Sequence, residues 1–366
     1  EDVLSFLSRK AVILKYGFPV DVVELDTQRA YQGSAASEVL LQRDLSIAIA
    51  EFAPTSKLVA NKQLWVSHGL KRVAEREWPQ RFYKRCVRHN VFLQWQEGEP
   101  EPSMPCGCNL HPRKYIVPRF GFITNRDKPR EPRSRPPKIF ATRPYFAGLT
   151  SVEPDTVSMP ESAPAVTMKR ASPGLMVVLC EGRRGRGFYI CSSCGSGFGS
   201  PQNPHKGPHG SECRGTLMPG VSLGHEFITD VLQLQFLHQK PVTGIEPVWF
   251  GFSLAYALVE GAADVLEVPS TDLSATIAYD ERYDIPPIIL YDNVPGGAGL
   301  VARLEREETF RHCLESALER VKGDCGCDDD ASCYGCLRSY RNQFAHQYLQ
   351  RGPIKHYLEE LIGIWE

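Results

Sequence analysis

Short apolar runs separated by turn-forming residues dominate the first half of the chain. Runs of this length, alternating with polar positions or bounded by turns, are typical of β-strands. They predict a β-rich region built from strands over residues 20–25, 58–60, 64–66 and 91–95. A further short apolar run, residues 188–190, predicts a strand in the middle of the chain.

Longer apolar stretches predict helices. Residues 3–14 and 38–52 are compatible with helices, the second ending before Pro54 because the residue preceding a proline disfavours helical geometry. In the last third, residues 225–238 read as an amphipathic helix. Residues 252–266 predict a helix with several alanines on one close-packing face.

A glycine-rich turn stands between the last predicted strands and a long predicted helix. Residues 274–279 and 287–291 predict strands, and a helix is expected from about residue 300 to 321. The turn lacks the Lys-Ser or Lys-Thr of a phosphate-binding loop and the full dinucleotide-binding spacing. We therefore expect the glycines to permit tight strand-to-helix packing, with Asp292 capping the helix.

Basic residues alternate with prolines over residues 126–144. Prolines hold a segment extended, so this stretch predicts an arm. Arg133 and Arg135 in it are candidate contacts to a phosphate backbone, the alternative being a solvated connector. Residues 151–167, rich in Ser and Pro and poor in aromatic residues, are expected to be flexible.

Length, charge and composition limit the classes of protein to which this chain can belong. A length of 366 residues predicts two or three domains, and a net charge of −1 gives no overall attraction for nucleic acid or membrane, so any such binding is local. No run of eighteen apolar residues and no signal peptide is found, so no membrane association is expected. Twelve cysteines, several in close pairs, indicate a reducing, cytoplasmic setting and metal binding. The chain begins with Glu1, which is compatible with a fragment of a longer protein.

Four cysteines near the C-terminus form two tight pairs joined by a short polar loop: Cys325, Cys327, Cys333 and Cys336. Two pairs facing each other across a loop supply the four thiolates of a tetrahedral Zn²⁺. The alternative is two disulfides, but a Cys-x-Cys bridge is strained. The three aspartates in the loop are expected to solvate it.

A second cluster lies in the middle of the chain. Cys191 and Cys194 have the spacing of a zinc knuckle, and Cys213 follows in a loop rich in Gly, Pro and His. The fourth ligand is open between His205 and His209, with His205 favoured because turn-forming residues follow it. A Cys-x-x-Cys redox pair or a knuckle without metal is the alternative.

A third cluster combines Cys86 and His89 with Cys106 and Cys108. Together they make a Cys₃His set, a known structural zinc combination. The alternative is three ordinary cysteines and a surface histidine. Two or three Zn²⁺ ions per chain are therefore expected. With three sites, the cysteines left over would be Cys180 and Cys313.

These patterns predict an α+β fold, with mixed small β units and helices organised around structural zinc sites. We expect four parts along the chain: an α/β region with the first candidate cluster (1–125), a basic Pro-rich arm with a flexible linker (126–170), a zinc-knuckle β unit (171–220) and a helical α/β domain with the four-cysteine site (221–366).

The C-terminal residues resemble a known family. Asp292–Leu300, the helix after it, the four-cysteine cluster and Leu337–Gln343 look like the MrfA-type zinc-binding (MZB) domain. Residues 15–25 and 41–70 are similar to the region preceding that domain in large superfamily 2 helicase-like proteins of bacterial DNA repair or phage defence. The resemblance implies one structural zinc on the four cysteines, and a domain that braces helicase modules and contacts DNA. The Cys₃His cluster departs from the family's Cys-x-x-Cys pairs.

No motor motif is present in the sequence, neither a phosphate-binding loop nor an Asp-Glu-x-His box, so the chain alone is not expected to hydrolyse ATP. We expect helicase motor domains in cis or in trans as partners, and no catalytic residue in this chain. Single- or double-stranded DNA would be contacted by the arm and by Arg338, Arg341 and Arg351. The alternative is a structural scaffold that binds a helicase partner without touching DNA. An enzyme using Asp292 has little support.

Overall fold

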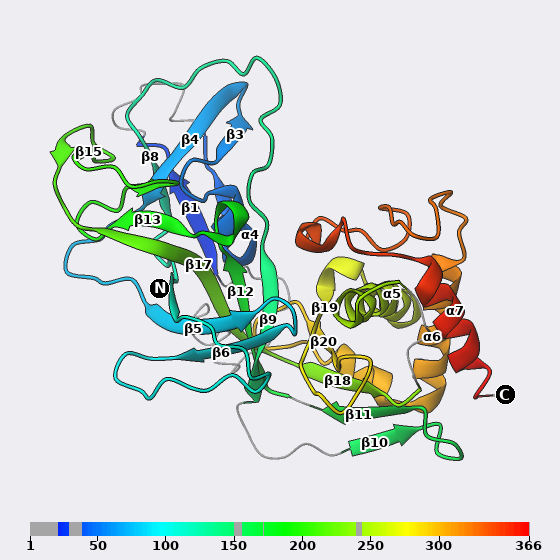
Figure 1. The fold of residues 1–366 in the computed structure, drawn as a ribbon. Coiled ribbons are helices and arrows are strands. Elements are labelled where there is room, and N and C mark those ends of the chain that lie inside the picture. The colour runs from blue at the N-terminus through cyan, green and yellow to red at the C-terminus, as the bar shows by residue number, and fades with distance from the viewer. Residues whose placement is uncertain (1–20, 29–38, 150–155, 171, 239–243, 366) are drawn as a thin grey trace.

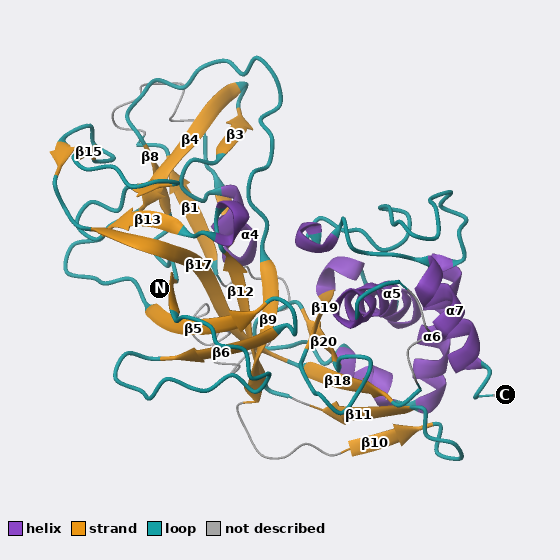
Figure 2. Cartoon of the chain, viewed as in Figure 1, coloured by secondary structure: helices purple, strands orange, loops and turns teal. Residues whose placement is uncertain are grey.

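The computed structural model describes residues 21–28, 39–149, 156–170, 172–238 and 244–365. Within these ranges there are four α-helices and twenty strands (Figures 1 and 2). The strands form three main sheets and a two-stranded ribbon. The predicted α+β class is confirmed. The helix predicted over residues 3–14 lies outside the described residues.

The first sheet has five strands and carries a short helix. Its order is β2 (Gln42–Asp44), β1 (Val22–Asp26), β8 (Phe122–Thr124), β4 (Gln63–Leu70) and β3 (Lys57–Ala60). Asp44 caps helix α4 (Leu45–Glu51) by accepting a hydrogen bond from the Ser46 N–H at 3.0 Å. The helix is shorter than the predicted 38–52 because residues 42–44 pair with β1 instead.

The second sheet has eight strands and surrounds the main core of the N-terminal half. Helix α4 packs against two of them, β12 and β17. The order is β14 (Gly197–Phe198), β13 (Phe188–Cys191), β17 (Leu217–Thr229), β7 (Arg113–Ile116), β5 (Gln80–Cys86) and β6 (Val91–Trp95), with β12 (Gly174–Cys180) pairing both β17 and β9 (Arg143–Leu149).

The third sheet is antiparallel and supports the C-terminal helices, which gather on one side of it in Figure 2. Its order is β10 (Thr156–Met159), β11 (Val166–Arg170), β18 (Val231–Phe236), β20 (Ile288–Asp292) and β19 (Leu273–Ile277). The helices are α5 (Pro247–Leu266), α6 (Glu307–Val321) and α7 (Gly352–Ile362).

Helix α5 is the central element of this half. It is long and apolar enough to cross a membrane, but 78% of its apolar window is buried among β19, β20 and α6, as expected of a core helix. A Cβ at Gly261 would lie 2.3 Å from the Cys313 carbonyl oxygen, so this glycine lets α6 approach closely. The helix predicted over residues 252–266 is confirmed, with small residues at its contact.

The glycine-rich turn also folds as predicted. Both strands before it are confirmed, and the long helix is divided into a 3₁₀ turn (Val301–Glu305) followed by α6. The Asp292 carboxylate accepts backbone N–H bonds from Ala298, Leu300 and Val301 at 2.7–3.0 Å. Asp292 therefore caps the 3₁₀ turn that precedes α6, whereas α6 itself begins after Arg306 without a side-chain cap.

Two predictions of local structure were wrong. Residues 225–238 are not a helix: they continue β17 and then form β18, with a break at Asp230. Leu232, Leu234 and Phe236 are all buried at period two, and a short apolar run does not distinguish strand from helix until its partners are known. Within the stretch expected to be flexible, residues 156–159 form β10 and Val166 begins β11.

Candidate metal centres and the cleft beside them

The structure brings the three predicted ligand sets together. In each set, one sulfur or ring nitrogen per residue lies within 4.8 Å of the others. We call them the hairpin centre (Cys86, His89, Cys106, Cys108), the knuckle centre (Cys191, Cys194, His205, Cys213) and the four-cysteine centre (Cys325, Cys327, Cys333, Cys336).

The hairpin centre takes its name from the β5–β6 hairpin. Cys86 ends β5, and His89 lies in the turn before β6, with 3.3 Å between Cys86 Sγ and His89 Nδ1. Cys108 arrives from the following loop, 3.7 Å from Cys86 Sγ. Gly107, between the two loop cysteines, has φ of +67°, a conformation that glycine adopts at little cost.

The knuckle centre combines a tight turn with a short ribbon. Cys191 ends β13, and the Gly195 N–H bonds back to the Cys191 carbonyl at 3.0 Å. In the ribbon, β15 (His205–Lys206) pairs with β16 (Glu212–Cys213), which places His205 directly opposite Cys213. His205 Nε2 lies 3.3 Å from Cys194 Sγ.

The open choice of fourth residue in this set falls on His205. His209, at the turn of the ribbon, points elsewhere, with its Nδ1 3.1 Å from Gln28 Oε1. Strand register thus separates two histidines that the sequence left undecided.

The four-cysteine centre follows the end of α6. Cys325 and Cys327 stand 3.4 Å apart at sulfur, and Cys336 Sγ lies 3.8 Å from Cys327 and 3.9 Å from Cys333. The Cys327 backbone N–H bonded to the Cys325 sulfur lowers the pKa of that thiol to about 7, which favours the thiolate that a metal binds.

These separations fit zinc. Four ligands around a tetrahedral Zn²⁺ with bonds near 2.3 Å place the sulfurs about 3.8 Å apart. A disulfide would need about 2.05 Å, and all twelve cysteines are free. Cys180 and Cys313 stand apart from the three sets: both are fully buried, and burial raises their thiol pKa to about 12.

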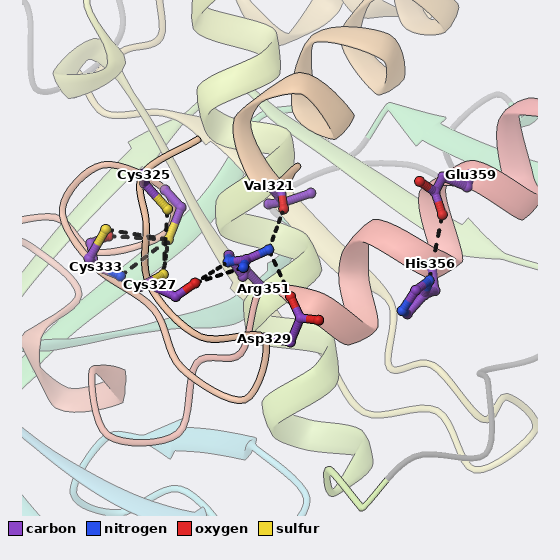
Figure 3. A network of polar contacts seen from close by, with 9 residues as sticks. Val321, Cys325, Cys327, Asp329, Cys333, Arg351, His356 and Glu359 are labelled. Carbon is purple, nitrogen blue, oxygen red and sulfur yellow. Dashed lines mark hydrogen bonds and ion pairs between the residues drawn. The ribbon is translucent and has the colours of Figure 1, made fainter. Parts of the chain in front are cut away.

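Arg351 has a different position from the one its predicted DNA contact requires. It is only 8% exposed, and its guanidinium donates to the Cys327 carbonyl at 2.6 and 2.9 Å (Figure 3). It also reaches the Val321 carbonyl at 3.3 Å and the Asp329 carboxylate at 2.8 Å. Its donors are therefore used to tie the metal loop to the end of α6, and it is not available to a phosphate.

The other predicted DNA-contact arginines lie on or near the surface. Arg338 donates to the Ser332 hydroxyl at 3.0 Å. Arg135 and Arg341 both line one cleft, although about two hundred positions separate them in the sequence. Arg133 is exposed but does not line that cleft.

Sequence reasoning named the arm, which carries Lys138, but missed further residues of the same cleft: Arg43, Lys57 and Tyr340. They come from strands β2 and β3 beside α4 and from the segment after the four-cysteine centre. No local motif announces such a set, because only the tertiary fold brings it together.

Comparison with known proteins identifies the class of the C-terminal half. Residues 254–337 match the family model of the MrfA Zn-binding (MZB) domain. The matched segment begins in α5 and includes all four residues of the four-cysteine centre. The resemblance stated from the sequence is thereby confirmed over residues 254–337, which match the MZB domain.

A curated relative is the Druantia protein DruE of Escherichia coli (strain UMEA 4076-1), 22% identical over 399 residues. The match covers 96% of this chain and 21% of DruE, so the chain spans about a fifth of that relative's length. Solved structures of the DUF1998 helicase MrfA are also similar. The DNA-bound form matches with a TM-score of 0.41 and 14% identity, and the match covers 100% of this chain and 39% of MrfA. The form with DNA and AMPPNP matches with a TM-score of 0.26 and 13% identity, and that match covers 68% of this chain and 26% of MrfA.

Proposed function

We propose that this chain is the zinc-stabilised accessory region of a DNA helicase of phage defence, with the motor elsewhere in the same protein or in a partner. The single observation that carries the proposal is the MZB match, which ends on the four-cysteine centre. The similarity to a Druantia protein over nearly the whole chain supports the defence setting. The three metal centres would hold structural Zn²⁺ and fix loops on both halves.

DNA contact is the second part of the proposal. The chain has almost no net charge, so attraction to phosphate must come from local groups of cations. Arg135 and Arg341 supply such a group across one cleft. A saturated four-ligand zinc has no open position, so the metal would support the fold and not a reaction.

The test is DNA affinity of the zinc-loaded chain, measured by fluorescence anisotropy with labelled oligonucleotides at two salt concentrations. Three phosphate contacts to a single strand predict about a twentyfold loss between 50 and 200 mM salt. Elemental mass spectrometry on the same sample gives the zinc content, for which we expect two or three ions per chain.

A sample with full zinc content and no salt-dependent affinity for single- or double-stranded DNA would overturn the DNA part. In that case the chain would be a scaffold for a helicase partner. No ATP hydrolysis by the isolated chain is expected, since the sequence has no phosphate-binding loop.

A further inference from the structure

A cleft of about 530 Å³ separates the N-terminal half from the MZB half. One wall is formed by α4, β3 and the arm around residues 135–144. The other wall includes Ser274, Asn293 and the segment from Tyr340 to Gln343, just after the four-cysteine centre.

The cleft is rich in positive charge. Five cationic side chains line it against one carboxylate, that of Glu51; the cations are Arg43, Lys57, Arg135, Lys138 and Arg341. Glu51 pairs with Arg43 at 3.1 Å and with Lys138 at 3.7 Å, and it accepts the Tyr340 hydroxyl. Across the described ranges, the side chains of Lys57, Arg135 and Arg341 have no hydrogen bond or ion pair.

The same cleft offers apolar and aromatic surface to a ligand. Tyr340 is 46% exposed, Ile139 44% and Val59 43%, so three large side chains offer their surface in one cleft. The Tyr340 ring is held by its hydroxyl bond to Glu51 and by Lys138, whose Nζ lies 3.3 Å from the ring centroid. A positioned aromatic ring among unpaired cations is the combination that single-stranded nucleic acid uses.

We propose that this cleft binds a segment of single-stranded DNA, with phosphates on Lys57, Arg135 and Arg341 and a base stacked on Tyr340. This inference rests on the proposed function, because it assumes that the chain meets DNA. Unpaired bases bury their faces against apolar side chains, whereas a duplex presents its phosphates and keeps its bases stacked inside. The apolar lining therefore favours a single strand over a duplex.

Glu51 opposes binding in this arrangement. Its carboxylate neutralises Arg43 and Lys138, and an incoming phosphate would have to compete with it for both. We therefore expect Glu51→Gln to bind a single-stranded oligonucleotide severalfold more tightly than the original chain, an outcome opposite in sign to the loss of a cation.

Two arginines of the arm provide a test position and a matched control for the role of the cations. Arg135 lines the cleft, while Arg133, two residues away on the same arm, is exposed and does not. Arg135→Ala and Arg341→Ala are each expected to weaken binding of a labelled oligothymidine about five- to tenfold and to reduce the salt slope by about 0.7. Arg133→Ala should change either quantity by less than about twofold, since it has no place in the cleft.

A second pair of variants distinguishes the contribution of the Tyr340 ring from that of its hydroxyl. Tyr340→Ala removes the stacking platform and should weaken single-strand binding about tenfold. Tyr340→Phe keeps the ring and loses only the bond to Glu51, so its affinity should stay near the original. Zinc content and thermal melting, measured on every variant, show whether the fold is retained.

The outcomes separate this inference from the proposed function. If the original chain binds DNA but Arg135→Ala and Arg341→Ala behave like Arg133→Ala, the cleft is not the site, although the proposed function stands. Equal affinity for duplex and single strand, with Tyr340→Ala unaltered, also overturns the inference. If the original chain binds no DNA at all, this inference and the DNA part of the proposed function both fail.

Discussion

The four-cysteine centre and the hairpin centre hold similar donors but lie in different surroundings. The first draws all its residues from twelve consecutive positions and is fastened by Arg351 within the MZB half. The second faces the other half: His89 packs edge-on against Tyr279 at 5.3 Å, and the Asn90 side chain donates to the Ile277 carbonyl at 2.6 Å. The first set therefore lies within one half, whereas contacts beside the second set join it to the other half.

The largest expected effect follows from disrupting the four-cysteine centre. Cys333→Ser or chelation should unfold the segment between α6 and α7, because structural zinc contributes on the order of 10–16 kcal/mol of apparent binding free energy, comparable to the stability of a whole domain. Hydrogen exchange over residues 322–351 should approach that of an unfolded chain. An unchanged melting curve after chelation would contradict this.

Loss of Arg351 should be the next largest effect. Arg351→Ala leaves the Cys327 and Val321 carbonyls without their donor, at a cost of about 3 kcal/mol in the free energy of unfolding. Chemical denaturation measures this loss in the free energy of unfolding. Arg338→Ala is the control, since the one partner of its side chain among the described residues is the Ser332 hydroxyl, and it should cost less than about 1 kcal/mol.

Breaking the contact between the halves should cost less again. Asn90 has φ of +53° and links Ile277 to Arg143, so Asn90→Gly keeps the backbone relaxed while removing both links. We expect a loss of about 2 kcal/mol, and about 1 kcal/mol more for Asn90→Ala, which adds left-handed strain. If both variants melt like the original chain, the Asn90 contact does not help to join the halves.

The smallest effect is expected from the cysteines outside the centres. Cys313→Ala and Cys180→Ala should leave the zinc content unchanged and cost about 1 kcal/mol each in packing. Elemental mass spectrometry decides the first point. Loss of one zinc from either variant would show that the ligand sets are drawn incorrectly.

The structure gathers the predicted ligand sets, and most of their pairs are close in sequence and lie on one turn, where spacing determines geometry. The choice of His205 depended on strand register, which turn-forming residues indicated only weakly. The internal partners of Arg351 were not predicted, because an arginine in an irregular segment looks the same in sequence whether it points to solvent or to buried carbonyls. Residues 225–238 were misread because burial on both faces of β18 conceals its period.

The third sheet has a consequence for dividing the chain into pieces. β20 lies between β19 and β18, and β18 in turn pairs with β11, but the matched MZB segment, residues 254–337, contains only β19 and β20. Excising that segment would expose the full hydrogen-bonding edge of β20, a buried and wholly apolar strand apart from its last residue. Such an edge pairs readily with other chains, so the excised piece should aggregate unless residues 156–170 and 231–236 accompany it.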